Sequence, residues 1–251
     1  MKTFPLILLT FLSITIFLES ASAQDSTASS TKKWYIGITA SPDLCYRSIF
    51  KTADADESTF FKSREKNDGI KFGYTAGFHV GYKFLKCLSL ETGVLYSNKG
   101  YTGGLFFGDQ IDPRYGFVYN TTSNIKKIEF RNNYNYIDVP ISVYYQCSKK
   151  KVGFIAYLGA TLNFYVNGNH TLVTSYNEGG TERKNIDLIG DVNKFNVSPS
   201  VGAGIFYSLS KVSSISMIPS FSYGLIEITN DPFSTKLWNA GLNVKYSYAI
   251  K

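Results

Sequence analysis

Cysteine and histidine are scarce in this sequence. It contains three cysteines and two histidines among 251 residues. The spacings of Cys45, Cys87 and Cys147 match no metal-binding motif, so the sequence predicts no zinc site. We expect no metal and no cofactor. An odd number of cysteines also excludes complete disulfide pairing within one chain.

Long apolar runs are absent beyond the first residues. Phe4 to Leu18 is mostly apolar, and Ala21-Ser22-Ala23 follows it. This order is typical of a secretory signal peptide, which we expect at residues 1–23, followed by a flexible lead-in at residues 24–33. No later stretch approaches the roughly 18 apolar residues that indicate a transmembrane helix. Helical membrane spans are therefore not expected.

Acidic residues are outnumbered by basic ones. The formal net charge is +7, which favours contact with acidic surface groups. No basic aromatic motif of the nucleic-acid-binding type occurs, so we expect no nucleic-acid partner. The aromatic content of 16%, mostly Tyr and Phe, suits lipid-facing strands and membrane interfaces.

Residues 71–98 carry the strongest pattern in the chain. Bulky apolar residues occupy every second position from Phe72 to Phe84, and small or polar residues lie between them. The alternation resumes at Leu88 after a tight turn. This period of two predicts a long β-hairpin with two different faces.

The two faces of this hairpin are unequal. One is bulky and apolar, whereas the other is mostly Gly, Ser and Thr with a few charges. A soluble barrel would bury the apolar face, and the glycine-rich face could not complete its core. An apolar face that points outward requires a hydrocarbon solvent. The pattern is typical of a transmembrane β-barrel.

The same alternation predicts eight strands within residues 34–251. They are expected at residues 34–40, 71–84, 88–97, 134–147, 152–166, 194–208, 214–224 and 235–250. Long loops are expected at residues 41–70, 99–133, 167–193 and 225–234, in alternation with short turns. Long outer loops and short periplasmic turns are typical of outer-membrane barrels. We therefore predict an all-β, eight-stranded antiparallel up-and-down transmembrane β-barrel in the bacterial outer membrane, after removal of the signal peptide.

Two segments resemble a known family. They are Gly77 to Gly100, GFHVGYKFLKCLSLETGVLYSNKG, and Tyr136 to Tyr145, YIDVPISVYY. The sequence resembles the PorT-family outer-membrane β-barrel domain of Bacteroidetes-type bacteria over most of the chain that follows the expected signal peptide. This resemblance implies a barrel in the outer membrane. It implies no activity, because many members of that family have none assigned.

Charged residues on the small-residue face should lie in the lumen. An eight-stranded barrel is only wide enough for side chains to fill its interior, so charges there must pair or stay hydrated. In the predicted hairpin Gly81 faces Glu91, with His79 and Lys83 on the diagonals. We interpret the lumen charges as a structural cluster and expect no catalytic residue. The cluster comprises His79, Lys83, Glu91, Asp138 and Lys245.

Aromatic residues gather in the second expected loop. As a binding surface they would supply rigid contacts to a ligand, but they could equally pack on one another and on the barrel rim. The expected partners are outer-membrane lipid and an extracellular ligand or envelope protein that contacts the long loops. The aromatic residues are Tyr101, Phe106, Phe107, Tyr115, Phe117 and Tyr119.

The favoured function is a non-enzymatic outer-membrane barrel with a filled lumen and long loops for surface contact or ligand binding. One alternative is a lipid-modifying outer-membrane enzyme, because His170 lies near Thr171, Thr174 and Ser175 in an expected outer loop. Another is a soluble periplasmic barrel that binds a small molecule. The glycine-rich face argues against this last alternative.

Two local features carry expectations of their own. Pro140 stands inside an expected strand, so we predict a bulge or a locally broken hydrogen bond at residues 138–141. Cys87 and Cys147 fall at the same rim of adjacent strands. The alternation turns Cys87 inward and Cys147 outward, so free thiols are favoured over a bridge.

Overall fold

The computed structural model describes residues 33–51, 68–105, 125–148, 150–176, 178–187, 192–229 and 233–250. The expected signal peptide lies outside the described residues, as does the expected lead-in apart from residue 33, and both stay predictions. In the described ranges, no helix is both long enough and apolar enough to cross a membrane.

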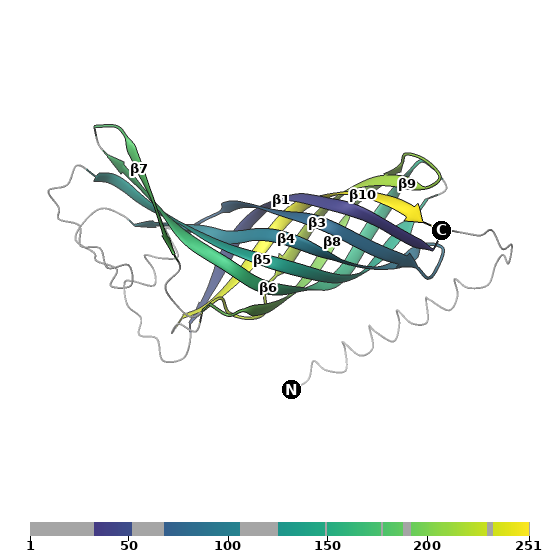
Figure 1. Ribbon diagram of the computed structural model, residues 1–251, viewed down its shortest axis with the longest axis horizontal. Coiled ribbons are helices and arrows are strands. Elements are labelled where there is room, and N and C mark those ends of the chain that lie inside the picture. The colour runs from purple at the N-terminus through teal and green to yellow at the C-terminus, as the bar shows by residue number, and fades with distance from the viewer. Residues whose placement is uncertain are drawn as a thin grey trace. The chain divides into compact units, whose positions relative to one another are not determined.

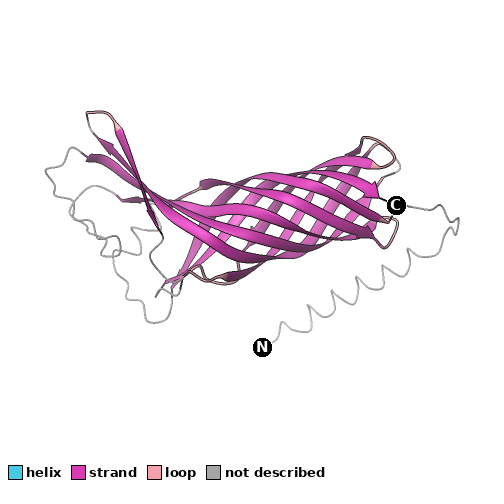
Figure 2. Cartoon of the chain, viewed as in Figure 1, coloured by secondary structure: helices cyan, strands magenta, loops and turns pink. Residues whose placement is uncertain are grey.

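Eight antiparallel strands close into a ring (Figures 1 and 2). They are β1 (Trp34–Lys51), β3 (Lys71–Lys83), β4 (Leu88–Leu105), β5 (Ile125–Cys147), β6 (Val152–Tyr176), β8 (Phe195–Ser208), β9 (Ser213–Tyr223) and β10 (Phe233–Ile250). Each strand pairs with the next in this order, and β1 pairs with β10 to complete the ring. The short strands β2 (Asp68–Gly69) and β7 (Thr181–Asp187) pair with β4 and β6 beside the ring. The predicted eight-stranded barrel is confirmed.

The exposed fractions of the side chains confirm which face points outward. Phe72, Phe78 and Leu158 are 82%, 72% and 69% exposed. On the opposite face His79 and Asn163 are 3% and 2% exposed. An apolar outer surface of this extent is stable only in hydrocarbon, because water would penalise its exposure. The alternative of a soluble periplasmic barrel is therefore wrong.

Outward aromatic side chains form two levels around the barrel. Near the short turns, Trp34 packs on Tyr82 with ring centroids 4.8 Å apart. Toward the other end, Phe164 packs on Phe195 at 5.4 Å, and Trp238 packs on Phe221 at 5.9 Å. Aromatic rings prefer membrane interfaces, and aliphatic side chains dominate between the two levels. The two levels therefore mark the membrane-spanning part of the barrel.

Several strands are longer than the sequence predicted. The expected loops at residues 41–70, 99–133 and 167–193 contain the end of β1, the end of β4, the start of β5, the end of β6 and all of β7. The expectation that these parts are loops is wrong, because cross-strand pairing and inward burial continue into them. In β1, for example, Cys45 is fully buried and Arg47 is 8% exposed, both on the inner face.

The strands β5 and β6 extend well beyond the membrane. They contain 23 and 25 residues, whereas a transmembrane strand needs only about 9–11. Figure 1 shows β5, β6 and β7 continuing past the other strands at the end opposite the short turns. We call the part made of residues 125–133 of β5, 167–176 of β6 and β7 the outer projection.

Serine side chains hold two of the short turns. Ser148 Oγ accepts a hydrogen bond from Lys150 N at 2.9 Å and donates to Val152 O at 2.7 Å. Ser210 Oγ accepts from Val212 N and Ser213 N at 3.1 and 3.0 Å. These bonds satisfy backbone groups that the strand ladders leave unpaired. The short connections expected at this end are confirmed.

Pro140 interrupts one ladder, as predicted. Pairing between β4 and β5 stops at Thr92 and Ile141 and resumes at Leu95 and Asp138 without a change of register. The proline lacks the N–H that this ladder would use. On the β6 side the pairing continues through Pro140. The outcome is a local loss of pairing and not a bulge.

Cys87 and Cys147 form a disulfide, so the expectation of free thiols is wrong. Their Cα atoms are 4.9 Å apart, within the usual range of roughly 4.4–6.8 Å. Cys87 precedes the first residue of β4, so the strand alternation does not fix the direction of its side chain. Gln146 N donates to Cys87 O at 2.8 Å and holds the two strand ends together. Cys45 is buried and free.

We expect alkylation of the unfolded protein to modify one thiol before reduction and three after reduction. The single thiol should be that of Cys45, because the disulfide protects the other two. Mass spectrometry of the peptides identifies the modified residues. Three modified thiols without reduction would contradict the bridge.

Candidate functional site

An ion pair crosses the lumen of the barrel. Lys245 on β10 pairs with Glu91 on β4, and both side chains are almost fully buried. Lys245 Nζ also donates to Tyr144 Oη at 3.1 Å. The hydroxyl of Tyr35 is 3.2 Å from Glu91 Oε2 and donates toward it. The hydroxyl of Tyr35 thus shares the charge of Glu91 with the lysine, because a buried carboxylate needs a counter-charge and hydrogen-bond donors.

His79 lies beside this pair and is held by two hydroxyl groups. Its Nδ1 is 2.9 Å from Thr39 Oγ1, and its Nε2 is 3.0 Å from Ser247 Oγ. Both ring nitrogens therefore have partners on the neighbouring strands β1 and β10. With 3% of its surface exposed, the imidazole is not accessible to a large substrate. This geometry suits a structural role.

A second group of charges lies closer to the outer end. Lys99 Nζ is 2.9 Å from Asp138 Oδ2, and Asn163 Nδ2 donates to Asp138 Oδ1 at 2.6 Å. Asp43 accepts hydrogen bonds from Ser41 and Thr75 at 2.7 and 2.6 Å. Each buried carboxylate described here has a cation or hydroxyl donors, whereas the buried hydroxyl of Ser97 has no hydrogen-bond partner among the described residues.

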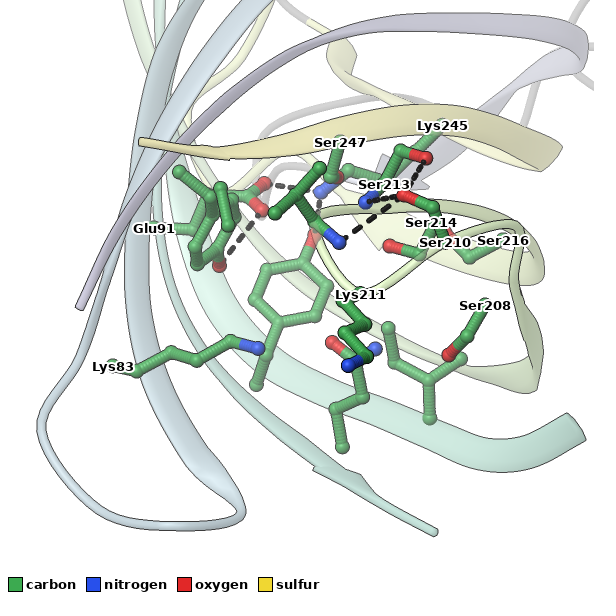
Figure 3. Close-up of a pocket in the computed structure, with 16 residues that line it drawn as sticks. Lys83, Glu91, Ser208, Ser210, Lys211, Ser213, Ser214, Ser216, Lys245 and Ser247 are labelled. Atoms are coloured by element: carbon green, nitrogen blue, oxygen red, sulfur yellow. Dashed lines mark hydrogen bonds and ion pairs between the residues drawn. The ribbon is translucent and has the colours of Figure 1, made fainter. Parts of the chain in front are cut away.

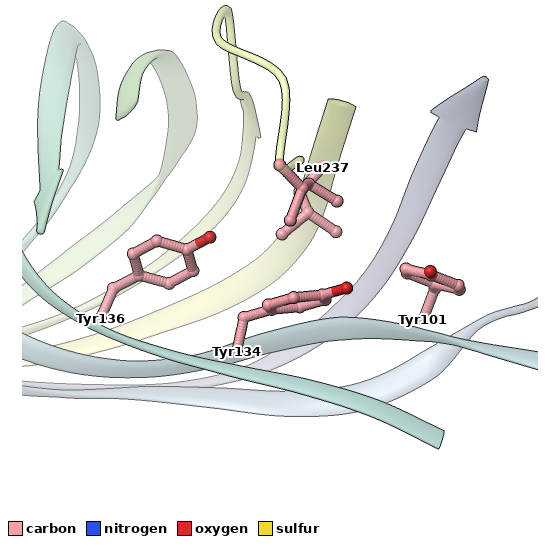
Figure 4. Close-up of a cluster of buried hydrophobic side chains, with 5 residues drawn as sticks. Tyr101, Tyr134, Tyr136 and Leu237 are labelled. Atoms are coloured by element: carbon pink, nitrogen blue, oxygen red, sulfur yellow. The ribbon is translucent and has the colours of Figure 1, made fainter. Parts of the chain in front are cut away.

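Aromatic side chains fill the outer end of the barrel. Tyr101, Tyr134 and Tyr136 pack with Ile228 and Leu237 in one buried cluster (Figure 4). Arg47 donates to Tyr101 Oη at 2.8 Å and forms two bonds with Asp68, at 2.6 and 3.0 Å. The cluster closes the lumen below the outer projection.

Large rings lie over the glycines of the inner face. A Cβ atom added at Gly81 would overlap the ring of Tyr35, and one at Gly202 would lie 2.5 Å from Tyr157. The glycines make room for rings from neighbouring strands. The lumen is therefore filled although its sequence is rich in glycine.

Two of the cavities lined by described residues lie in the lumen. One has a volume of about 110 Å³ and lies at the end with the short turns, and the other has about 80 Å³ and lies toward the outer end. Glu91, Tyr144 and Lys245 line both cavities. The ion pair therefore lies at the boundary between the two cavities.

The structure brings together only part of the predicted cluster. Gly81 faces Glu91 as predicted, and His79 and Lys245 lie near Glu91. The expected contact with Lys83 is wrong, because Lys245 takes this position from across the lumen. Lys83 is exposed at the barrel mouth, with its Nζ 6.0 Å from the centroid of the Tyr35 ring. Asp138 belongs to the separate pair with Lys99.

Several lumen residues lie where the sequence predicts loops. Asp43, Arg47 and Lys99 fall within the expected loops, although the alternation of Asp43, Cys45 and Arg47 is itself a signal that the strand continues. Tyr101 was also assigned to a loop, but it lies in β4 and is 7% exposed, so its assignment to a loop binding surface is wrong. The remaining residues of that surface, Phe106, Phe107, Tyr115, Phe117 and Tyr119, lie outside the described residues.

His170 lies in β6 within the outer projection. Its Nδ1 contacts the side-chain amide oxygen of Asn132 on β5. Burial lowers the pKa of the His170 imidazole, which is therefore neutral at pH 7. An amide partner at Nδ1 orients the ring but supplies no nucleophile. Over the described ranges, no three metal-binding side chains gather in a manner that could hold an ion, and the absence of a metal site stays a prediction.

The match to a known family agrees with the architecture. The profile of the family described as outer membrane protein beta-barrel domain matches residues 22–230. No curated protein matches the sequence. Similar solved structures include surface protein A of Neisseria (12% identity, 86% of this chain and 97% of that chain, TM-score 0.40) and the attachment invasion locus protein Ail of Yersinia pestis (11%, 86% and 99%, 0.37). OprG of Pseudomonas aeruginosa is also similar (10%, 88% and 97%, 0.42).

Proposed function

The chain belongs to the outer membrane protein beta-barrel domain family, and from this premise we propose that it is a non-enzymatic barrel whose outer projection and outer loops make contacts at the cell surface. The protein is located in the bacterial outer membrane. We include the narrower membership in the PorT family in this proposal, because it rests on the segments at residues 77–100 and 136–145.

The outer projection is the observation that carries this proposal. Its outward side presents amide groups that pair between strands. At its base, Asn135 Nδ2 donates to Asn167 Oδ1 at 2.6 Å, and within it Asn133 Nδ2 donates to Asn169 Oδ1 at 2.9 Å. On the next strand pair, Thr171 Oγ1 donates to Asn185 Oδ1 at 3.0 Å. These bonds fix the side chains before a ligand arrives, which lowers the entropic cost of binding.

Each paired amide keeps further hydrogen-bonding capacity. An Asn side chain has two N–H donors and two lone pairs on its oxygen, and one pairing uses only part of them. The exposed charges of Arg131 and β7 lie beside this row. An ordered polar surface of this kind suits a polysaccharide or the polar surface of another protein. The filled lumen, by contrast, supports no role in solute passage.

Removal of residues 169–187 tests the proposal. This deletion takes away the end of β6 and all of β7 but leaves the lumen contacts of Glu91 and Asp138 in place. We expect cells with the shortened protein to lose attachment to polysaccharide-coated and protein-coated surfaces, down to the level of cells without the gene. Heat-modifiable gel mobility verifies that the barrel still folds.

A matched control lies at the opposite end of the barrel. The variant Lys150→Gln/Lys151→Gln changes an exposed short turn and should attach like the unmodified protein. The lipid-modifying enzyme makes a different prediction. If the acyl pattern of lipid A changes when the gene is deleted, while attachment does not, the non-enzymatic proposal is wrong.

A further inference from the structure

The cavity at the end with the short turns has an unusual lining. It has a volume of about 110 Å³ and is lined by residues of all eight strands of the ring and of the turn between β8 and β9 (Figure 3). Serine and lysine side chains make up most of its polar lining. The serines are Ser208, Ser210, Ser213, Ser214, Ser216 and Ser247.

Three of these serines form a row across neighbouring strands. Ser214 on β9 pairs in register with Ser208 on β8 and with Ser247 on β10. Ser247 is bonded to His79. The hydroxyls of Ser208 and Ser214, however, have no hydrogen-bond partner among the residues that the structure describes. The row therefore presents hydroxyl donors to the cavity from two adjacent strands.

Two lysines reach the same cavity without a counter-charge. Figure 3 shows Lys83 and Lys211 extending toward its centre, one from the end of β3 and one from the β8–β9 turn. In the described parts of the chain, neither lysine has an ion-pair partner. The only carboxylate of the lining is Glu91, which is already paired with Lys245. With three lysines and one glutamate, the lining carries a net charge of +2.

We propose that this cavity is a binding site for a phosphate-type oxyanion at the periplasmic mouth of the barrel. Lys83 and Lys211 supply the positive charge, and the hydroxyls of Ser208 and Ser214 donate hydrogen bonds. Charge-assisted hydrogen bonds to an oxyanion are stronger than neutral ones, and a partly enclosed site reduces their screening by salt. Several donors on different strands suit a tetrahedral anion better than a planar carboxylate.

The surrounding structure holds the site in place. The disulfide joins Cys87, next to the turn after Lys83, to Cys147, which follows the lining residue Gln146. Ser210 Oγ bonds to the backbone of the β8–β9 turn and fixes the loop that carries Lys211. Little ordering is needed when an anion binds, which favours affinity.

Titration calorimetry of the full-length protein in detergent, with inorganic phosphate as the probe, tests this inference. We expect saturable binding of one phosphate per barrel. The variant Lys83→Gln/Lys211→Gln should weaken this binding at least tenfold, and Ser214→Ala should weaken it by a smaller factor. Lys150→Gln/Lys151→Gln removes two rim lysines that do not line the cavity, and it should bind phosphate like the unmodified protein.

Further titrations identify the source of the anion. Glycerol phosphate represents a soluble phosphate, and phosphatidylglycerol in mixed micelles represents a lipid headgroup. Displacement of phosphate by either compound supports the site and identifies the source of the anion. Absence of saturable phosphate binding would overturn the proposal. So would equal binding of phosphate and acetate, or equal losses in the Lys83/Lys211 variant and in the Lys150/Lys151 control.

Discussion

Replacement of Lys245 by methionine is expected to destabilise the barrel by about 3–5 kcal/mol, because it leaves the buried carboxylate of Glu91 without its cation. Lys245 and Glu91 are 4% and 6% exposed, so water cannot replace the lost partner fully. The substitution also removes the hydrogen bond to Tyr144. Urea-induced unfolding of the protein in lipid vesicles measures the loss.

The double variant Glu91→Gln/Lys245→Met separates this cause from a packing defect. It removes both charges, and the glutamine can still accept from the hydroxyl of Tyr35. We therefore expect the double variant to recover most of the lost stability, since replacing both members of a buried ion pair is often neutral. Equal losses in the single and double variants would show that the pair is not the cause.

An arginine at an outward position in the middle of the membrane should have the second-largest effect. Val80 lies between the aromatic levels on β3, and Leu242 lies between them on β10. Replacing either residue with arginine should destabilise the barrel by about 2–4 kcal/mol, because the guanidinium would face hydrocarbon. Unfolding in lipid vesicles again measures the change.

Asn167→Arg provides the matched control. This residue is exposed on β6 beyond the outer aromatic level, where the cost of an arginine should fall to about 0–1 kcal/mol. Arginine at Gly77 should act differently, because this residue faces inward and an added Cβ would approach Leu95. If Val80→Arg and Leu242→Arg are as stable as Asn167→Arg, the assigned position of the membrane is wrong.

Local sequence patterns determined the architecture of this protein. The alternation from Phe72 to Phe84 reveals which face of β3 is apolar, and eight such segments with short and long connections predict the barrel. This works because a strand turns successive side chains to opposite faces, so the contrast between an apolar and a polar face is visible directly in the order of neighbouring residues. The signal from Pro140 is equally local, since its missing N–H removes one ladder hydrogen bond from a strand that is paired on both sides.

The extent of the strands was harder to predict. Asp43, Arg47 and Lys99 look like loop residues because they are polar, yet they continue the inner face of β1 and β4. Beyond the membrane, neither face of a strand must be apolar, so the contrast between the faces disappears. Cross-strand pairing then maintains the strand without a clear sequence signal.

Only the closed ring determines which charged residues pair with one another in the lumen. Glu91 pairs with Lys245, which is 154 positions away, and not with the nearby Lys83. The sequence showed that both residues face inward. It could not show how far each strand is shifted along the next, and the accumulated shift around a barrel sets which residues meet across the lumen. The sequence therefore determined the fold and the facing of the charges, whereas the tertiary structure decided their pairing, the disulfide and the cavities that remain.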